Sequence, residues 1–439
     1  MTRRLTALLA AAGLAVAAAL GPATPAQARD KQQLKVATYN IYQGADLTPL
    51  VTAPTQQELV RRAGIAYAQV VATDFPARAR AISRLLRKDR PNVVGLQEVA
   101  LWKKGPLGGQ LQVTYDFLDI LLRELRRAGL HYRAAAIDTT FSGAVPISAT
   151  EQASFTDRDA ILVQDGLRVT NAQSHLYTAK LVVNSPAGIT FTIPRGWSAV
   201  DVGLAYQRTR VRVATTHLEP QAPAIRNAQG QELYAALAQS PLPVVAIGDF
   251  NSPPTDATGP YGTFTNGGYA DAWQTVHGPG DGFTATQDPD LRNLPSKLDR
   301  RIDYVFYQRT PLSAVSAHLI GNQVRDRTPN GLWPSDHAGL VAALRLKPGV
   351  PTKVPAGHQG DDPSQSTLGD SGTGTSSPDG QSAVGQEPTG AWAGAASETR
   401  HSAGPIAAAL AASALTLSAL VLTGWRRWPA RPRRKPTDR

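Results

Sequence analysis

The chain has 439 residues, enough for one large domain with appended segments. With 42% hydrophobic and 18% charged residues it has the balance of a globular protein, and the absence of Cys excludes disulfides and thiolate metal ligands. The formal net charge is +11, of which about +7 falls on residues 29–350, an excess that suits an anionic substrate.

Residues 1–28 are typical of a secretory signal peptide. Arg3 and Arg4 precede an apolar run from Leu5 to Leu20, and residues 26–28 have the A-x-A pattern of a cleavage site. We expect cleavage after Ala28; an N-terminal membrane helix is the alternative.

Residues 29–350 are the expected folded domain. Short runs rich in Val and Ile predict strands over 34–42, 92–99, 131–137, 159–164, 211–219, 243–251, 301–308 and 338–347. Helices are predicted over 56–72, 78–88, 115–128 and 224–239. In the third, Leu118, Leu121, Leu122 and Leu125 recur at helical spacing and should face the core. Many strands with interspersed helices favour packed sheets with helices outside.

Polar residues that a core does not need stand at the ends of the predicted strands. They are Asn40, Glu98, His217, Asp249, Asn251, Asp303, Asp336 and His337. Taken singly, most have an ordinary structural explanation, such as a turn or an ion pair. Because packed sheets bring strand ends to one rim, the whole set could converge. Carboxylate oxygens are ligands that suit Mg²⁺, with Mn²⁺ or Ca²⁺ as alternatives, and His and Asn side chains can bind phosphate oxygens.

In chain order, the motifs TYN, LQE, THL, GDFN, RIDYVF and SDH resemble those of the deoxyribonuclease-I-like endonuclease/exonuclease/phosphatase superfamily. The resemblance covers roughly Leu34 to Leu346. It implies an α+β fold, a four-layer αββα sandwich of two mixed β-sheets flanked by helices, with the site on one rim.

The same resemblance implies roles for the strand-end residues. Metal ligands are expected at Asn40, Glu98 and Asp336. Catalytic and phosphate-binding groups are expected at His217, Asp249, Asn251, Asp303 and His337. Among these, Asp249 is expected to activate water, and Asp303 to support the site or hold a second metal.

Two segments depart from the family pattern. The segment between Asn40 and Glu98 is longer than in the family, and residues 45–76 look like an insertion. We expect this insertion to border the site. Arg158 is the candidate contact for the substrate phosphate, and Asp157 or Asp159 could hold that position instead.

The expected substrate is a phosphoester, with nucleic acid favoured over phospholipid. Arg208, Arg210 and Arg212 alternate along one predicted strand that leads to His217, and Arg300 and Arg301 precede Asp303, so a basic rim is expected.

Two other functions stay open. A sphingomyelinase-like phospholipid phosphodiesterase would need an exposed apolar loop, and residues 191–207, with Phe191 and Trp197, could supply it or form a packed hairpin. A catalytically silent surface adhesin is the third reading. The segment SKLDRRIDYVF lacks the inositol-phosphatase signature, which argues against a polyphosphoinositide phosphatase.

The C-terminal part predicts a membrane anchor. Residues 351–403, rich in Pro, Gly and Ser, are expected to form a disordered stalk. Residues 404–425 carry no charge and suffice to cross a bilayer, and the basic segment 426–439 should lie in the cytoplasm. The sequence thus predicts a single-pass cell-membrane enzyme with an extracellular catalytic domain and no obligate protein partner.

Overall fold

The computed structural model describes residues 33–203 and 210–347, which fall within one compact unit. The predicted signal peptide, stalk, transmembrane helix and basic tail lie outside these residues, as does Arg208. Among the residues that the structure describes, no helix is both long and apolar enough to cross a membrane.

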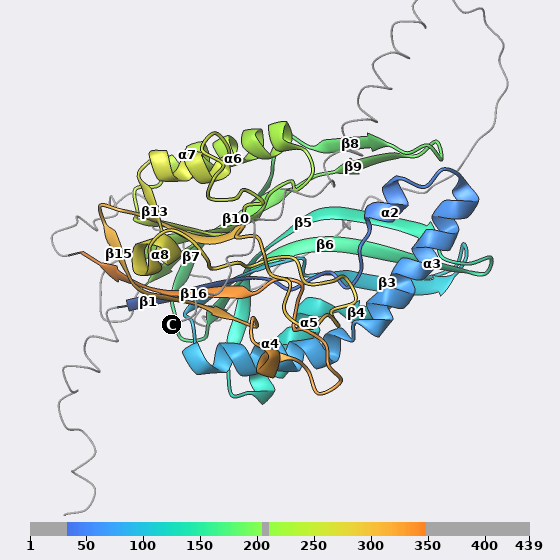
Figure 1. Cartoon of the computed structure of the whole chain (residues 1–439), viewed down its shortest axis with the longest axis horizontal. Coiled ribbons are helices and arrows are strands. Elements are labelled where there is room, and N and C mark those ends of the chain that lie inside the picture. The colour runs from blue at the N-terminus through green and yellow to red at the C-terminus, as the bar shows by residue number, and fades with distance from the viewer. Residues whose placement is uncertain (1–32, 204–209, 348–439) are drawn as a thin grey trace, which may run out of the picture. The chain divides into compact units, whose positions relative to one another are not determined.

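Sheet A, the larger of two mixed sheets, contains the first and the last described strands (Figure 1). In spatial order its strands are β15 (Leu312–Ile320), β16 (Gly339–Leu346), β1 (Gln33–Asn40), β2 (Val93–Gln97), β6 (Glu151–Gln164), β3 (Leu101–Pro106) and β4 (Gln112–Asp116), with β5 (Tyr132–Pro146) paired to β6. β1 and β2 run parallel, whereas the other pairs are antiparallel. The parallel pair brings the ends of β1 and β2 to the same edge.

Sheet B carries the second half of the predicted motifs. Its strands, in spatial order, are β13 (Tyr269–Asp271), β14 (Asp303–Gln308), β12 (Val244–Asp249), β11 (Arg210–His217), β10 (Gly196–Gly203) and β7 (Val169–Leu176). β11 and β12 run parallel, and β14 pairs antiparallel to β12. The end of β11, the end of β12 and the start of β14 therefore lie side by side.

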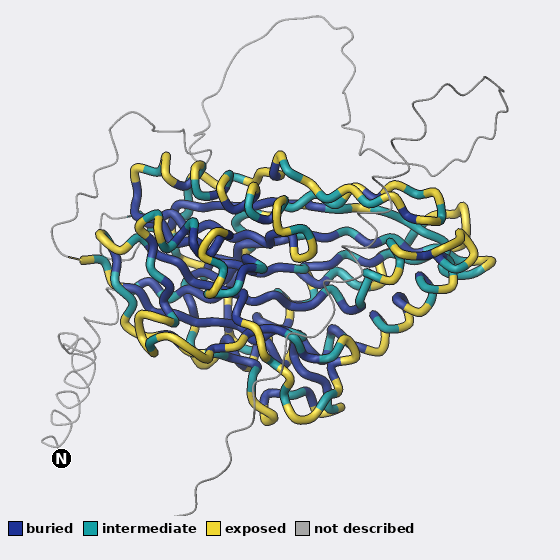
Figure 2. Tube along the Cα trace, turned by 45° about the horizontal axis from the view of Figure 1, so that its top comes forward, coloured by how far each residue is buried: buried dark blue, intermediate teal, exposed yellow. Residues whose placement is uncertain are grey.

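The two sheets stack face to face with helices outside, as the sequence predicts (Figure 1). Buried Val and Ile side chains from both sheets form the central core, which includes Val36, Val213 and Val305. Helices α4 (Phe75–Asp89) and α5 (Phe117–Arg127) pack on sheet A, and α6 (Pro223–Ala238) and α7 (Pro260–Asn266) pack on sheet B. Figure 2 shows the buried strands between exposed outer segments.

The predicted helices are confirmed within a few residues. α3 spans Gln56–Ala72, the predicted range, and Thr55 caps its first turn by accepting from the Glu58 amide. On α5, Leu118, Leu121 and Leu125 are buried as expected. The sequence does not predict α7 or the short helices α2 (Thr48–Val51), α8 (Ala272–His277) and η1 (Val324–Asp326).

The candidate membrane loop is a packed element. Hairpin β8 (Leu181–Asn184) and β9 (Thr190–Ile193) reaches the predicted insertion, where Phe191 packs against Ala53 and Leu59. Phe191 is 8% exposed and Trp197, in strand β10, is 6% exposed. Of the two alternatives for these side chains, an exposed apolar loop and a packed hairpin, the structure favours packing, because the insertion and sheet B cover them.

Candidate active site

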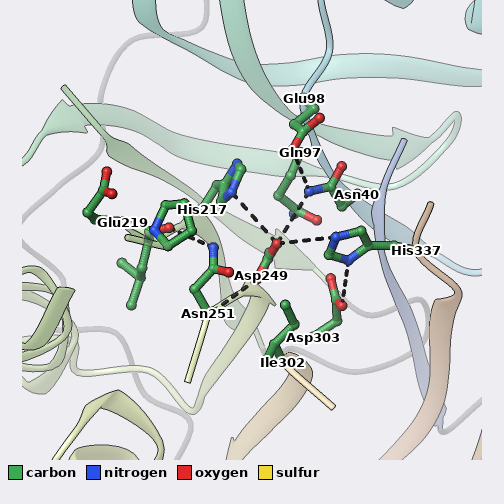
Figure 3. A network of polar contacts seen from close by, with 12 residues as sticks. Asn40, Gln97, Glu98, His217, Glu219, Asp249, Asn251, Ile302, Asp303 and His337 are labelled. Carbon is green, nitrogen blue, oxygen red and sulfur yellow. Dashed lines mark hydrogen bonds and ion pairs between the residues drawn. The ribbon is translucent and has the colours of Figure 1, made fainter. Parts of the chain in front are cut away.

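Three predicted site residues lie in one row across sheet B. Register places His217 on β11 beside Asp249 on β12, and Asp249 beside Asp303 on β14. From sheet A, Asn40 at the end of β1 joins this row, since its Nδ2 atom donates to Asp249 Oδ2 at 3.3 Å and to Glu98 Oε1 at 3.0 Å. Figure 3 shows Asp249 at the centre of the cluster. The site thus spans the rim of both sheets.

Asp249 is buried between two imidazoles. Its Oδ2 atom lies 3.7 Å from Nε2 of His217 and 3.9 Å from Nε2 of His337. Its Oδ1 atom accepts from the backbone amide of Asn251 at 2.9 Å. Burial, and next the neighbouring Asp303, raise the pKa of Asp249 to about 7. A carboxyl group with such a pKa can accept a proton near neutral pH.

The two imidazoles differ in charge. Burial by itself lowers the pKa of His337. The Oδ2 atom of Asp303 lies 2.8 Å from Nδ1 of this ring, and the negative charge of Asp303 has the larger effect. The pKa of His337 is therefore well above its usual value. Burial, and then the cation of Arg195, hold the pKa of His217 well below its usual value. At neutral pH the site therefore has one imidazolium and one neutral imidazole.

Two of the predicted site residues adopt a left-handed backbone. Glu98 has φ 58° and Asn251 has φ 50°. For a residue other than Gly this conformation is uncommon and costs energy, so it persists where neighbours hold it. The Glu98 carboxylate accepts from the Gln43 amide at 2.8 Å, and Asn251 Nδ2 donates to the Leu218 carbonyl at 2.8 Å. Both side chains are thus fixed at the rim.

The donor set fits a hard divalent cation. In the described residues, Asp249, Asp303 and His337 have side-chain atoms that all lie within 4.8 Å of one another, and Asp303 Oδ1 is buried without a hydrogen-bond partner. Because an imidazolium has no free lone pair, the two carboxylates are the ligands that this cluster offers while His337 is protonated. The ligands predicted from the sequence are a second candidate set of metal ligands. In this set Asn40 donates to Glu98 at 3.0 Å, and Asp336 is close enough to Glu98 for the two charges to interact. Burial, with a further contribution from Glu98, raises the pKa of Asp336 to about 6. Carboxylates crowded in this way are suited to sharing a cation.

A buried arginine holds the loops that carry two of these ligands. Arg78 on α4 is 0% exposed, and its guanidinium lies 4.9 Å from the ring centre of Phe75. Its Nη atoms donate to the carbonyls of Ile41 (2.6 Å), Tyr42 (3.1 Å) and Pro334 (3.1 Å). Ile41 and Tyr42 follow Asn40, and Pro334 precedes Asp336. Sequence reasoning placed Arg78 on a predicted helix and assigned it no role in the site.

Arg158 does not join the cluster. Its side chain donates to the carbonyl of Val99 at 2.9 Å and pairs with Asp116 at 2.7 Å. Successive residues of a strand point to opposite faces, so Arg158 points away from its neighbours Asp157 and Asp159. Those two aspartates, the alternatives at this position, are buried toward the site.

A residue that sequence reasoning missed, Arg195, lies in the cluster. Its Nη1 atom is 3.1 Å from Nδ1 of His217 and 3.4 Å from Asp157 Oδ2. Its Nε atom is 3.9 Å from Glu219 Oε2 and has no hydrogen-bond partner. Arg195 directly precedes β10, a strand that was not predicted, so no spacing pattern linked it to His217.

Three buried aspartates lie next to Arg195. Asp138 on β5 accepts from the amide of Asp159 at 2.9 Å, and Asp159 accepts from the amide of Glu98 at 3.3 Å. Burial raises the pKa of Asp138 to about 7 and that of Asp157 to about 6, and holds the pKa of Asp159 well above its usual value. Through these hydrogen bonds Asp159 holds the backbone of Glu98, and Asp138 holds the backbone of Asp159.

Two arginines of the expected basic rim are buried in ion pairs. Arg212 is buried and pairs with Asp201 at 2.8 Å, and Arg301 is buried in an ion pair with Asp271. Arg212 also points to the face opposite His217, since the two are five residues apart on one strand. The expectation that Arg212 and Arg301 face an anionic substrate is therefore wrong.

The fold consists of two stacked mixed sheets, and the site has a histidine–carboxylate pair beside a buried aspartate, with oxygen donors for a hard cation. Together these features are those of a metal-dependent phosphoester hydrolase. The model of the Endonuclease/Exonuclease/phosphatase family matches residues 37–337, and the chain belongs to this family. Members of the family are metal-dependent phosphoester hydrolases, and this chain is an enzyme of that class.

Solved structures of similar fold come from several organisms. An endonuclease/exonuclease/phosphatase from Beutenbergia cavernae is 24% identical, with a TM-score of 0.46, and the match covers 72% of each chain. A family protein from Bacteroides thetaiotaomicron is 15% identical (TM-score 0.46; 72% of this chain, 98% of that one). The human Nocturnin catalytic domain with a bound sulfate anion is 18% identical (TM-score 0.43; 72% and 95%). A search of curated proteins finds no match. None of these likenesses bears on the substrate.

Proposed function

We propose that the chain is a Mg²⁺-dependent phosphodiesterase, and specifically a nuclease, in which water attacks phosphorus directly. The observation that carries the proposal is the placement of Asp249 between His217 and His337, in hydrogen-bond contact with Asn40. This arrangement joins a group that can take a proton from water to groups that can hold phosphate oxygens.

In the proposed mechanism each side chain has one task. Asp249 accepts the proton of the attacking water, and Asn251, whose amide anchors Asp249, lines the same rim. The imidazolium of His337 and the guanidinium of Arg195 bind phosphate oxygens and balance the charge that develops on them. Neutral His217 donates a further hydrogen bond. A divalent cation held by Asn40, Glu98 and Asp336 would supply Lewis-acid stabilisation of the same charge.

Direct attack by water is favoured over a covalent intermediate. The chain has no Cys, and among the described residues no Ser hydroxyl is hydrogen-bonded to the ring of a histidine. The serine in the site, Ser335, donates to the Asn40 carbonyl at 2.7 Å and so holds a loop. Mass spectrometry of enzyme quenched during turnover should find no phosphorylated residue, and a trapped adduct would reject this mechanism.

Nucleic acid is favoured over phospholipid as the substrate. A lipid hydrolase needs apolar side chains that enter the bilayer, and the two candidates for that task, Phe191 and Trp197, are buried. The decisive test compares hydrolysis of duplex DNA, RNA and sphingomyelin vesicles by the full chain, with and without Mg²⁺. Turnover of sphingomyelin alone would establish the lipid hydrolase in place of the nuclease.

We further propose that the catalytic domain lies outside the cell on a C-terminal anchor. The support is sequence alone: the signal-peptide pattern of residues 1–28 and the uncharged segment 404–425 followed by a basic tail. Protease treatment of intact cells should release a fragment with phosphodiesterase activity. Protection of the domain in intact cells, with cleavage after lysis, would contradict this topology.

A further inference from the structure

Helix α4 exposes a stripe of uncompensated positive charge. Its exposed side chains are Arg80, Arg84, Arg87 and Lys88, spaced so that they share one face of the helix. The rest of α4 is buried against sheet A and α5 or half-buried. The outward surface of this helix is therefore cationic from Arg80 to Lys88. We call these four residues the basic stripe.

None of the four cations of the basic stripe has an ion-pair or hydrogen-bond partner within residues 33–203 and 210–347. The acidic residue nearest in sequence, Asp89, pairs instead with His318 at 3.0 Å. This contrasts with Arg212 and Arg301, which are buried with carboxylates. Four exposed cations without a partner among the described residues are thus gathered on the single helix α4.

A further exposed arginine lies alongside the stripe. The chain from β15 to η1 follows α4, because His318 contacts Asp89 and the backbone of Gly321 approaches Leu85. Farther on, Asn330 donates to Asp74 at the start of α4. Arg325 lies between these contacts, is exposed, and has no partner among the described residues.

Helix electrostatics explain only part of the stripe. Cations in the last turn stabilise a helix through its dipole, which accounts for Arg87 and Lys88. Arg80 and Arg84 lie in the middle of α4, where the dipole gives no such gain. Like charges one turn apart repel, so the arrangement costs stability unless an anion offsets it.

We propose that the basic stripe, with Arg325, binds the phosphate backbone of a nucleic acid. The uncompensated cations form a line, which matches a chain of phosphates better than the broad plane of a membrane. The exposed Val324 is the one large apolar side chain exposed on α4, α5 or η1, so these described elements have little to insert into lipid. Guanidinium groups bind phosphate with two hydrogen bonds, and three of the four stripe residues are arginine.

This proposal rests on the proposed nuclease function and adds a second contact region to it. Arg78, on the opposite side of the same helix, holds the loop next to Asn40. The stripe therefore starts two residues after Arg78, on the other side of the helix, and runs from Arg80 to Lys88 along α4. A substrate long enough to reach both regions would bind more tightly than a short one, without any change in the catalytic step.

The test measures binding of a short fluorescent duplex DNA to the full chain carrying Asp249→Asn, which prevents hydrolysis. The probe variant adds Arg80→Gln, Arg84→Gln and Arg87→Gln. On duplex DNA each phosphate contact contributes about −0.9 to the slope of log K against log salt. We expect the slope to become shallower by about 2 to 3 and affinity at low salt to fall at least about tenfold.

The matched control removes the same charge from paired surface arginines. It carries Arg61→Gln, Arg123→Gln and Arg133→Gln, whose partners are Glu58, Asp119 and Asp165. Its salt slope should stay close to that of the parent chain. Equal slopes for probe and control would overturn the proposal, because the effect would then be one of net charge. Loss of binding to phosphatidylglycerol vesicles with duplex binding unchanged would assign the stripe to a membrane instead.

A second readout separates this proposal from the proposed function. With Asp249 restored, the probe variant should hydrolyse bis(p-nitrophenyl) phosphate at the parental rate, since this small diester cannot reach α4. If the parent hydrolyses that diester but binds no duplex, the stripe proposal fails alone. If it binds duplex through the stripe but hydrolyses no phosphodiester, the proposed function fails alone. The single variant Arg84→Glu gives the same comparison should the triple variant prove unstable.

Discussion

The Oδ2 atom of Asp303 lies 2.8 Å from Nδ1 of His337, which leaves Nε2 of that imidazole directed toward Asp249. The carboxylate therefore orients the ring and keeps it protonated. Asp303→Asn should lower kcat/KM by about a hundredfold. It should also move the alkaline limb of the pH–rate profile to lower pH, because the pKa of His337 falls. An unmoved alkaline limb would show that His337 does not set it.

The proposed base, Asp249, predicts the acidic limb of the same profile. A carboxyl group with a pKa of about 7 must lose its proton to act, so the rate should rise as pH increases through neutrality. Asp249→Asn should reduce kcat by about a thousandfold and abolish that rise. A variant that keeps the acidic limb would place the base elsewhere.

Metal dependence is tested at Glu98. Activity should disappear in excess EDTA and return with Mg²⁺, and parallel additions of Mn²⁺ and Ca²⁺ identify the preferred ion. Glu98→Gln should abolish most activity, since stabilisation by the metal is worth several kcal/mol. Calorimetric titration gives a readout without turnover: Mg²⁺ should bind the parent chain and bind Glu98→Gln much more weakly. Equal binding by both would remove Glu98 from the ligand set.

Substitutions of Arg195 and Arg158 test which of the two arginines contacts the substrate. Arg195 lies 3.1 Å from His217, whereas Arg158 points to the other face of its strand. Arg195→Gln should lower kcat/KM about 10- to 100-fold, the loss expected for a hydrogen bond to a charged group. Arg158→Gln should change kcat/KM only a few-fold and mainly lower the Tm. The opposite ranking would restore the phosphate contact to Arg158.

The buried carboxyl group of Asp138 predicts how stability depends on pH. Its pKa is about 7 in the folded chain and 3.8 for an ordinary aspartate, so the folded state holds the proton more tightly. This contribution is complete below about pH 4 and is lost as pH rises through 7. The metal-free chain should therefore lose several degrees of Tm over that range, and Asp138→Asn should lose fewer. An identical pH dependence in the variant would exclude Asp138 as the source.

Most of the candidate site could be predicted because of where its residues stand. Asn40, His217 and Asp249 each end a short strand rich in apolar residues, and these runs together with the family resemblance predict that the three residues lie close together. The structure places all the predicted site residues except Arg158 at one rim. Their catalytic roles remain predictions.

The missed features depend on contacts that a sequence does not display. β5 and β6 are 15 and 14 residues long, yet only the apolar part of each was predicted. For the segment that contains β10, the sequence leaves an exposed apolar loop and a packed hairpin open, because apolar content does not tell a buried strand from an exposed segment. Arg212 pairs with an aspartate eleven residues away and Arg301 with one thirty residues away, so neither partner follows from local spacing.

The row formed by His217, Asp249 and Asp303 has a consequence for how the enzyme loses activity. All three belong to neighbouring, hydrogen-bonded strands in the interior of sheet B, not to separate loops. Core strands open only when the whole domain opens, so the backbone amides of this row should exchange with deuterium no faster than global unfolding allows. Heat inactivation and unfolding should accordingly occur together, with no folded but inactive species between them.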